Sequence, residues 1–252
     1  MAKPKFIELD EDIRIPILYE DRSIVAIDKP FGWMLVPDSW DKTNRNLQLA
    51  IQSSINAGDF WARSRQIRFL RYIHRLDADT TGVMLFAKSL AAVNTYGELF
   101  ADRRVEKIYL AVVASSPPSP EWICQQRLSA DPNVNGVRYV DEQNGKDAVT
   151  YFRVLQKNPP FCLIEARPTT GRTHQIRLHL QASGLGILHD PLYAPGNVRP
   201  AKVTGELALR AASLSYADPF QRRRIFIRAP LEEFLARYGF EPLRKEGRRS
   251  CR

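Results

Sequence analysis

The chain has 252 residues, and its 44% hydrophobic and 10% aromatic content excludes a wholly disordered protein. No apolar run approaches the roughly 18 residues that a membrane-spanning helix needs, and residues 1–12 lack the apolar core of a signal peptide, so we expect a cytoplasmic protein. Lys and Arg number 37 against 28 Asp and Glu, a net charge of +9. The excess is mostly Arg, which favours a polyanionic partner but leaves a merely basic protein open.

The first half of the chain is predicted to combine short strands with two helices behind an irregular arm at residues 1–16. Between the two helices lies an arginine-dense stretch, residues 61–75, in which aromatic residues alternate with arginines. Strands are expected at 17–19, 23–28, 83–87 and 108–114, and helices at 47–55, which Gly58 ends, and after the N-cap Ser89.

The second half is predicted to be richer in strands. It begins after a Pro/Ser loop at 115–120, the one internal segment with linker composition. Strands are expected at 123–128, 137–140, 148–155, 161–166, 214–216 and 224–227, and helices at 173–183 and 231–238, followed by a basic tail at 244–252.

The predicted strands outnumber the helices and do not alternate with them regularly. This pattern favours an α+β fold with a mixed, largely antiparallel sheet and flanking helices and loops, and disfavours a doubly wound fold. Strands on both sides of the Pro/Ser loop are best joined in one sheet. We therefore expect one domain at residues 17–243, between the arm at 1–16 and the tail at 244–252.

Three polar stretches are candidates for chemistry. Residues 71–82 (RYIHRLDADTTG) lead into a buried strand, residues 167–177 (RPTTGRTHQIR) lead into a helix, and Lys107 and Tyr109 share one face of a strand. Each has a structural interpretation as well: a turn in which Asp77 or Asp79 caps local amides, a capped amphipathic helix with a basic surface, and a core-edge aromatic residue.

A metal site is not expected. His174 and His179 lie five residues apart, so they point about 140° apart on a helix and do not form a two-histidine zinc site. The three cysteines are distant from one another in the sequence, which argues against a metal knuckle or a disulfide framework. No phosphate-binding or dinucleotide-binding glycine motif is present, and so no cofactor is predicted.

Together these stretches resemble a family. Residues 74–82 (HRLDADTTG) with 86–88 (FAK), then 107–111 (KIYLA) and 170–180 (TGRTHQIRLHL), are similar in order and spacing to the RluA-type RNA pseudouridine synthases. Residues 24–32 (IVAIDKPFG) and 190–193 (DPLY) fit the same family, and the resemblance covers about residues 17–233. The sequence departs from the family pattern at Ala78, Thr81, His189 and Arg210, which leaves the reaction in place but obscures which RNA is recognised.

The resemblance implies the pseudouridine synthase catalytic fold and an enzyme that isomerises a uridine of rRNA or tRNA to pseudouridine. The bonds broken and formed lie within the substrate, so the reaction needs no redox cofactor. Asp77 is the implied catalytic carboxylate, and Arg177 its implied partner in a bidentate pair. A purely structural Asp77–Arg177 ion pair is the alternative.

The target uridine must be flipped out of its stack. Tyr109 is the candidate for stacking on the flipped base, Arg75 for filling the vacated space, and Leu209 for an apolar wall. Lys107, Arg172 and His174 are candidates for binding phosphate or sugar. The arginine-dense stretch suits contacts to structured RNA, or else is a solvated basic face. The sequence has no segment for a separate small RNA-binding domain ahead of residue 17, so we expect recognition by the catalytic domain itself.

The partner is therefore predicted to be structured RNA, without DNA or membrane, and the protein to be a monomer. Two other functions stay open from the sequence. One is a catalytically silent RNA-binding or ribosome-assembly factor on the same scaffold, which would bind RNA and modify none. The other is a metal-dependent nuclease, which would lose activity with a chelator.

Overall fold

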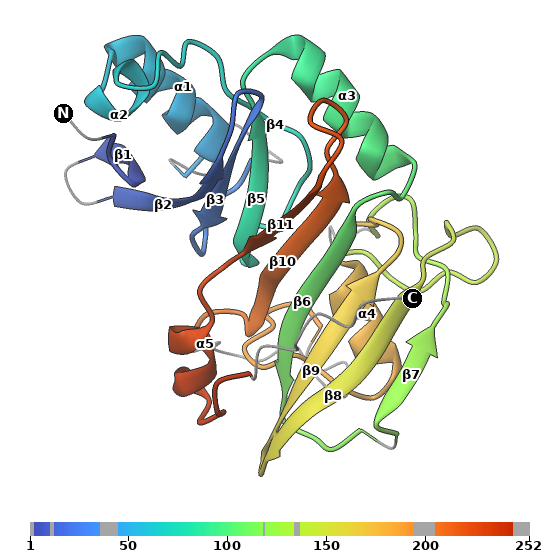
Figure 1. Ribbon diagram of the computed structural model, residues 1–252. Helices are drawn as coiled ribbons and strands as arrows, with labels where there is room; N and C mark the ends of the chain where they lie inside the picture. Colours follow the sequence, from blue (N-terminus) through green and yellow to red (C-terminus); the bar gives the residue numbers. More distant parts are fainter. Residues whose placement is uncertain are drawn as a thin grey trace.

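The computed structural model describes residues 3–10, 13–35, 45–117, 119–133, 137–193 and 205–243, and its strands form one eleven-stranded sheet (Figure 1). The strands are β1 (Phe6–Asp10), β2 (Ile13–Glu20), β3 (Ile24–Lys29), β4 (Arg71–Tyr72), β5 (Thr81–Ala87), β6 (Glu106–Val113), β7 (Glu121–Cys124), β8 (Thr150–Asn158), β9 (Phe161–Pro168), β10 (Leu209–Ala217) and β11 (Arg224–Arg228). The helices are α1 (Leu47–Ala57), α2 (Phe60–Arg63), α3 (Leu90–Ala101), α4 (Gln175–Ala182) and α5 (Glu232–Arg237).

The sheet is mixed and largely antiparallel, as predicted. Its order is β1-β2-β3-β5-β10-β6-β9-β8-β7, with β4 added to β5 and β11 added to β10. Among the strand pairs of the described residues, only β5 and β10 run parallel. Strands from both sides of the Pro/Ser loop meet at the centre of this sheet, so they do not form two separate sheets.

The parallel β5–β10 contact depends on a glycine. Gly82 has a φ of +112°, and a Cβ built there would lie 2.2 Å from the carbonyl oxygen of Ala211 on β10. No residue with a side chain fits this close approach without moving the backbone. Gly82 therefore lets the loop that precedes β5 lie directly beside the start of β10.

The prediction of an irregular arm at residues 1–16 is wrong. β1 and β2 pair antiparallel, with Ile7 opposite Ile15, and both of these side chains are buried. Their apolar positions alternate with polar ones, which is the period of a strand that buries one face. The acidic residues around Asp10 concealed that pattern in the sequence.

Most other elements agree with the prediction. Ser89 caps α3 by accepting a hydrogen bond from the backbone N–H of Ala92, and Gly58 ends α1 in the left-handed conformation. Residues 137–140 were predicted as a strand, but the only strand-like contact in the described part of that segment is an isolated bridge between Leu128 and Val140. Helix α4 begins at Gln175, two residues later than predicted, because His174 is in the left-handed region.

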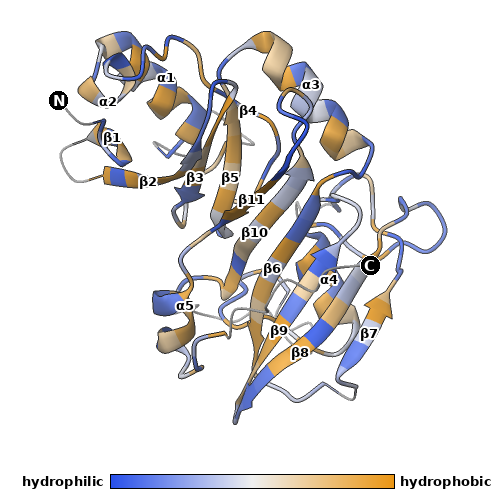
Figure 2. Cartoon of the chain, viewed as in Figure 1, coloured by the Kyte–Doolittle hydropathy of each residue, from blue (hydrophilic) through white to orange (hydrophobic). Residues whose placement is uncertain are grey.

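Helices and loops cover the sheet around three main hydrophobic clusters. One lies under α1 and α2, one under α3, and one between α4, α5 and the strands from β10 to β8. Figure 2 shows hydrophobic residues along the central strands and hydrophilic residues at the β10–β11 turn. In the part of the chain that the structure describes, every helix is too short or too polar to cross a bilayer.

Candidate active site

Four segments that are distant in the sequence line one cleft of about 520 Å³. They are the loop between β4 and β5, the stretch from the end of α3 into the first half of β6, the turn from β9 into α4, and the start of β10. All eight residues that the sequence singled out line this cleft: Arg75, Asp77, Lys107, Tyr109, Arg172, His174, Arg177 and Leu209.

Asp77 lies next to Arg177, but the expected bidentate pair is wrong. Nη1 of Arg177 is 3.6 Å from Oδ2 of Asp77, a single contact. The bidentate partner is Asp190, whose two oxygens accept from Nε and Nη2 of Arg177 at 2.8 and 2.7 Å. The Arg177 side chain is only 2% exposed. Burial lowers the pKa of Arg177, but the hydrogen bonds and charge of Asp190 and the charge of Asp77 together outweigh burial, so this pKa is raised. Asp190 thus fixes the guanidinium of Arg177, and the Nη1 atom of that guanidinium faces Asp77.

His174 is the second group beside Asp77. It is the residue before α4, with a φ of +55°, and this backbone conformation directs its ring into the cleft. Nδ1 lies 2.8 Å from the Tyr193 hydroxyl, and Nε2 lies 3.9 Å from Oδ1 of Asp77. Burial lowers the pKa of His174, so the ring is neutral at pH 7 and Arg177 supplies the positive charge beside Asp77.

Lys29 supports the loop that carries Asp77, a role that the sequence did not predict. Its side chain is 1% exposed, and Nζ donates to the carbonyl oxygens of Ala78 and Thr80 at 2.7 and 3.0 Å. Burial lowers the pKa of Lys29 to about 7, although Asp79 and Asp77 raise it in part. Two sequence features could have indicated the role of Lys29: it stands before a proline at the end of β3, and residues 24–32 resemble the family. The Asp190 and Tyr193 contacts were likewise missed, although residues 190–193 had been matched to the family.

Tyr109 and Leu209 provide the apolar part of the cleft. Tyr109, on β6, is partly buried against two hydrophobic clusters and still lines the cleft. Leu209, at the start of β10, is paired with Ala111 of β6 and is nearly fully buried. Lys107, two residues before Tyr109, donates to the carbonyl oxygen of Thr170 at 2.9 Å, and burial lowers its pKa to about 8.

Arg75 and Arg172 lie at the rim. Arg75 is exposed beside the Asp77 loop. Nε of Arg172 donates to the carbonyl oxygen of Asp147 at 3.1 Å, which anchors this arginine to the neighbouring loop. Asp79, the other carboxylate of the Asp77 loop, does not line the cleft, whereas Asp77 does. The structure therefore agrees with the sequence motif in making Asp77 the candidate catalytic carboxylate.

Only the end of the arginine-dense stretch, residues 73–75, lines the cleft, and residues 61–72 lie outside it and contribute more to structure than expected. Trp61 is fully buried and donates to Ser54, so it is not a stacking platform. Arg65 forms an ion pair with Glu20 at 2.8 Å, and its side chain is almost inaccessible. The interleaved aromatic and arginine residues are therefore not one continuous RNA-binding face.

Two departures from the family pattern have structural explanations. Arg210 donates to Asp28 and Thr81 and to the carbonyl oxygen of Pro230, so it links β10 with β5 and β3 and does not line the cleft. His189 has a φ of +60°, the left-handed region where glycine is the least strained residue.

The described residues contain no group of three or more His, Cys, Asp or Glu arranged to hold a metal ion. Both ring nitrogens of His179 are already engaged, with the Thr150 hydroxyl and the carbonyl oxygen of Gln126. The His74 ring accepts from the backbone N–H of Leu85 through Nε2. These two histidines have structural roles.

The fold defines the class. A human protein titled RNA Pseudouridylate Synthase Domain Containing 4 superposes with a TM-score of 0.68, at 24% sequence identity, over 87% of this chain and 90% of that one. The α+β architecture around the cleft is thus the pseudouridine synthase catalytic fold that the sequence predicted.

Sequence comparison gives the family. The RNA pseudouridylate synthase family matches residues 23–182, and the chain belongs to this family. It is 32% identical to ribosomal large subunit pseudouridine synthase C of Vibrio cholerae over 87% of its length, but covers only 66% of that relative. Ribosomal large subunit pseudouridine synthase D of Xanthomonas campestris is 31% identical, over 96% of this chain and 73% of the relative.

Proposed function

We propose that this protein isomerises a specific uridine of structured RNA, either rRNA or tRNA, to pseudouridine, with Asp77 as the essential carboxylate. The observation that carries the proposal is the convergence of all eight predicted residues on one cleft around Asp77. These residues come from four segments of the chain. If the segments were only a solvated turn and a capped amphipathic helix, their polar side chains would have no reason to lie in the same cleft. The two named bacterial relatives, which are ribosomal large subunit enzymes, favour rRNA over tRNA.

Asp77 has the surroundings that a reactive carboxylate needs. A carboxylate in a water-poor cleft loses solvation, and an adjacent fixed cation compensates for that loss. Arg177 supplies the cation at 3.6 Å, and Asp190 prevents the guanidinium from rotating away. Asp77 can then add to the sugar or the base and leave again, or remove a sugar proton and return it. The glycosidic bond to N1 breaks and the bond from the sugar to C5 forms, while C5 loses its hydrogen as a proton and N1 gains a proton. No external electron donor or acceptor takes part.

The target nucleotide has to enter the cleft unstacked, which costs a few kcal/mol. Tyr109 offers an aromatic face next to Asp77, and stacking of one base on such a face contributes about 1–3 kcal/mol. Leu209 closes the apolar side of the cleft. Arg75 is exposed at the rim and is long enough to occupy the space that the flipped base leaves in the RNA.

Lys107, Arg172 and His174 position the sugar and phosphates. Lys107 and Arg172 each donate to a backbone carbonyl, which orients their remaining N–H groups at the cleft rim. The neutral His174 ring lies between Tyr193 and Asp77 and can donate to or accept from a ribose hydroxyl. The domain limits, the monomeric state, the cytoplasmic location and the absence of DNA binding stay predictions.

The test is a comparison of pseudouridine maps. Total RNA from cells with and without the gene is labelled with a pseudouridine-specific reagent and read by reverse transcription. We expect at least one uridine in rRNA or tRNA to lose its label in the deletion strain. That label should return when the purified protein is incubated with the unmodified RNA in the presence of a chelator.

Two results would contradict the proposal. Identical maps with and without the gene, combined with tight RNA binding by the purified protein, would indicate a catalytically silent RNA-binding factor. RNA cleavage that the chelator abolishes would indicate a nuclease. The position of the restored label identifies the RNA and the uridine.

A further inference from the structure

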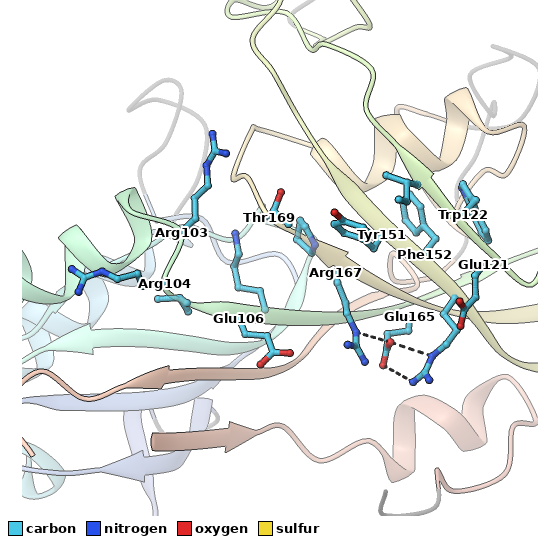
Figure 3. Close-up of a pocket in the computed structure, with 15 residues that line it drawn as sticks. Arg103, Arg104, Glu106, Glu121, Trp122, Tyr151, Phe152, Glu165, Arg167 and Thr169 are labelled. Carbon is cyan, nitrogen blue, oxygen red and sulfur yellow. Dashed lines mark hydrogen bonds and ion pairs between the residues drawn. The ribbon is translucent and has the colours of Figure 1, made fainter. Parts of the chain in front are cut away.

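A second hollow of about 890 Å³, which we call the outer groove, lies beside the cleft (Figure 3). Tyr109 of β6 is paired with Ala166 of β9, so the alternating neighbours Glu165 and Arg167 point to the other face of the sheet. Glu165 and Arg167 line the outer groove, whereas Tyr109 lines the cleft. The two hollows are therefore on opposite faces and meet at the end of the sheet where β6 begins and β9 ends. There they share Arg103, Lys107, Pro168 and Thr169.

An aliphatic, an aromatic and an arginine side chain form the floor of the outer groove. Ile123 of β7 is paired with Tyr151 of β8, and Tyr151 with Arg167 of β9, so the three side chains form one row across the sheet. Tyr151 is 45% exposed and Ile123 is 52% exposed. This row gives a flat aromatic and aliphatic surface next to guanidinium groups, which suits stacking of a nucleic-acid base.

The walls of the outer groove are predominantly basic. Five cationic and three acidic side chains line it. Glu165 forms ion pairs with Arg153 and Arg167, at 3.4 and 2.8 Å, so one carboxylate holds two guanidinium groups that line the outer groove. Figure 3 shows Glu165 beside Arg167. A second of the acids, Glu106, forms an ion pair with Arg224, which is not part of the groove. The net positive charge complements a phosphate backbone.

We propose that the outer groove binds a single-stranded segment of the substrate RNA that flanks the target uridine. This segment continues from the cleft past Arg103 and Thr169, around the end of the sheet where β6 begins and β9 ends. This inference rests on the proposed function, because it extends the path of the same RNA. A base stacks on Tyr151, and Arg103 contacts a phosphate at the point where the strand passes from one face to the other. The two roles predict different responses to salt.

The test is RNA binding by two groove variants, with a fluorescein-labelled oligouridylate of twelve nucleotides as the probe. Tyr151→Thr removes the aromatic face and keeps strand propensity. We expect it to weaken binding about tenfold with an unchanged dependence on salt. Arg103 has a φ of +59°, so Arg103→Asn removes the charge and keeps a residue that tolerates this backbone. We expect weaker binding and a log–log salt slope reduced by about 0.7.

Each variant has a matched control outside both hollows. Phe226→Thr removes another exposed aromatic residue from a strand, and Arg222→Asn removes another exposed arginine with a left-handed backbone, at a φ of +53°. Both controls should bind the probe within twofold of the wild type. A probe that carries 4-thiouridine should also crosslink to β8, within residues 150–158, in the wild-type protein.

Groove variants that bind like their controls, with no crosslink to β8, would overturn the inference while leaving pseudouridine formation intact. A concentration-dependent dimer in sedimentation velocity that Tyr151→Thr abolishes would overturn it as well, because a second copy would then occupy the groove. Conversely, normal groove effects without any pseudouridine formation would contradict the proposed function rather than the path of the RNA.

Discussion

The cleft and the outer groove contain the same chemical pair in two different environments. Arg177, which lines the cleft, is joined to Asp190 at 2.8 and 2.7 Å, and the two side chains are 2% and 0% exposed. In the groove, Arg167 and Glu165 are also 2.8 Å apart, but 43% of the Arg167 side chain is exposed. The N–O distances of the two pairs are nearly equal, so their different burial decides what each pair contributes. The buried Arg177–Asp190 pair fixes the position of the Arg177 guanidinium. Solvent and salt screen the Arg167–Glu165 pair, so it contributes less to stability.

Asp190→Asn should have the largest effect on stability. It leaves the buried Arg177 without its bidentate carboxylate, and loss of one partner of a buried pair costs about 3–5 kcal/mol. We expect the free energy of unfolding in urea to fall by about this amount, together with lower kcat because Arg177 is no longer held towards Asp77. Glu165→Gln in the outer groove is the comparison. If it lowered the free energy of unfolding more than Asp190→Asn does, the exposed pair and not the buried pair would be the more important one for stability.

Lys29 predicts a dependence of stability on pH. Its pKa is about 7 in the folded protein and 10.5 is the ordinary value, so the unfolded chain binds more protons between these limits. Stability should therefore rise with pH from about 7 to 9, by up to about 1.4 kcal/mol per pH unit. Lys107 adds a contribution of the same sign from about pH 8.

The measurement is urea unfolding between pH 6 and 9 for the wild type, Lys29→Met and Lys107→Met. Lys29→Met should flatten the rise that begins near pH 7, while Lys107→Met should retain it. The slope is the readout, because Lys29→Met also removes three hydrogen bonds to carbonyl oxygens. An identical slope in Lys29→Met and the wild type would show that Lys29 is not the titrating group.

Two substitutions of Tyr109 distinguish stacking by its ring from hydrogen bonding by its hydroxyl group. Tyr109→Phe keeps the aromatic face, so we expect kcat/KM for RNA to stay within about threefold of the wild type. Tyr109→Ala removes the face and should lower kcat/KM about thirtyfold, since one stacked base is worth about 1–3 kcal/mol. If Phe and Ala lower kcat/KM equally, the hydroxyl group and not the ring carries the role of Tyr109.

An ion pair beside the groove should show the smallest effect. Asp102 and Arg104 are 2.9 Å apart, and both side chains are more than half exposed. Asp102→Ala should change the free energy of unfolding by less than about 0.5 kcal/mol, in urea unfolding at low salt. A loss above 2 kcal/mol would mean that exposure does not decide the strength of ion pairs in this protein.

The sequence predicted the positions of elements better than their partners. Ser89, Gly58 and the strand at residues 83–87 are local signals, and the structure confirms them. The eight cleft residues were found through motif resemblance, because they come from four distant segments that no local pattern brings together. The strands in residues 1–16 were missed because acidic residues interrupt a short alternating pattern.

Pairing between side chains was the harder part. Charge alone does not tell which of Asp77 and Asp190 takes two hydrogen bonds from Arg177, since both are carboxylates near the same guanidinium. Lys29 looked like the end of a strand, and its role depends on carbonyl groups about fifty residues away. The outer groove combines β7, β8 and β9 with the turn after α3 and the start of β6, so it exists only in the folded sheet.

The most direct test of the account is Asp77→Asn, assayed on the RNA whose label depends on the protein. The two side chains have the same size, so Arg177 stays held by Asp190 and the cleft keeps its shape. We predict that pseudouridine formation falls by a factor of about 10³ or more, while RNA affinity and the free energy of unfolding stay close to those of the wild type. Pseudouridine formation by Asp77→Asn within tenfold of the wild-type rate would contradict the assignment of Asp77 as the essential carboxylate.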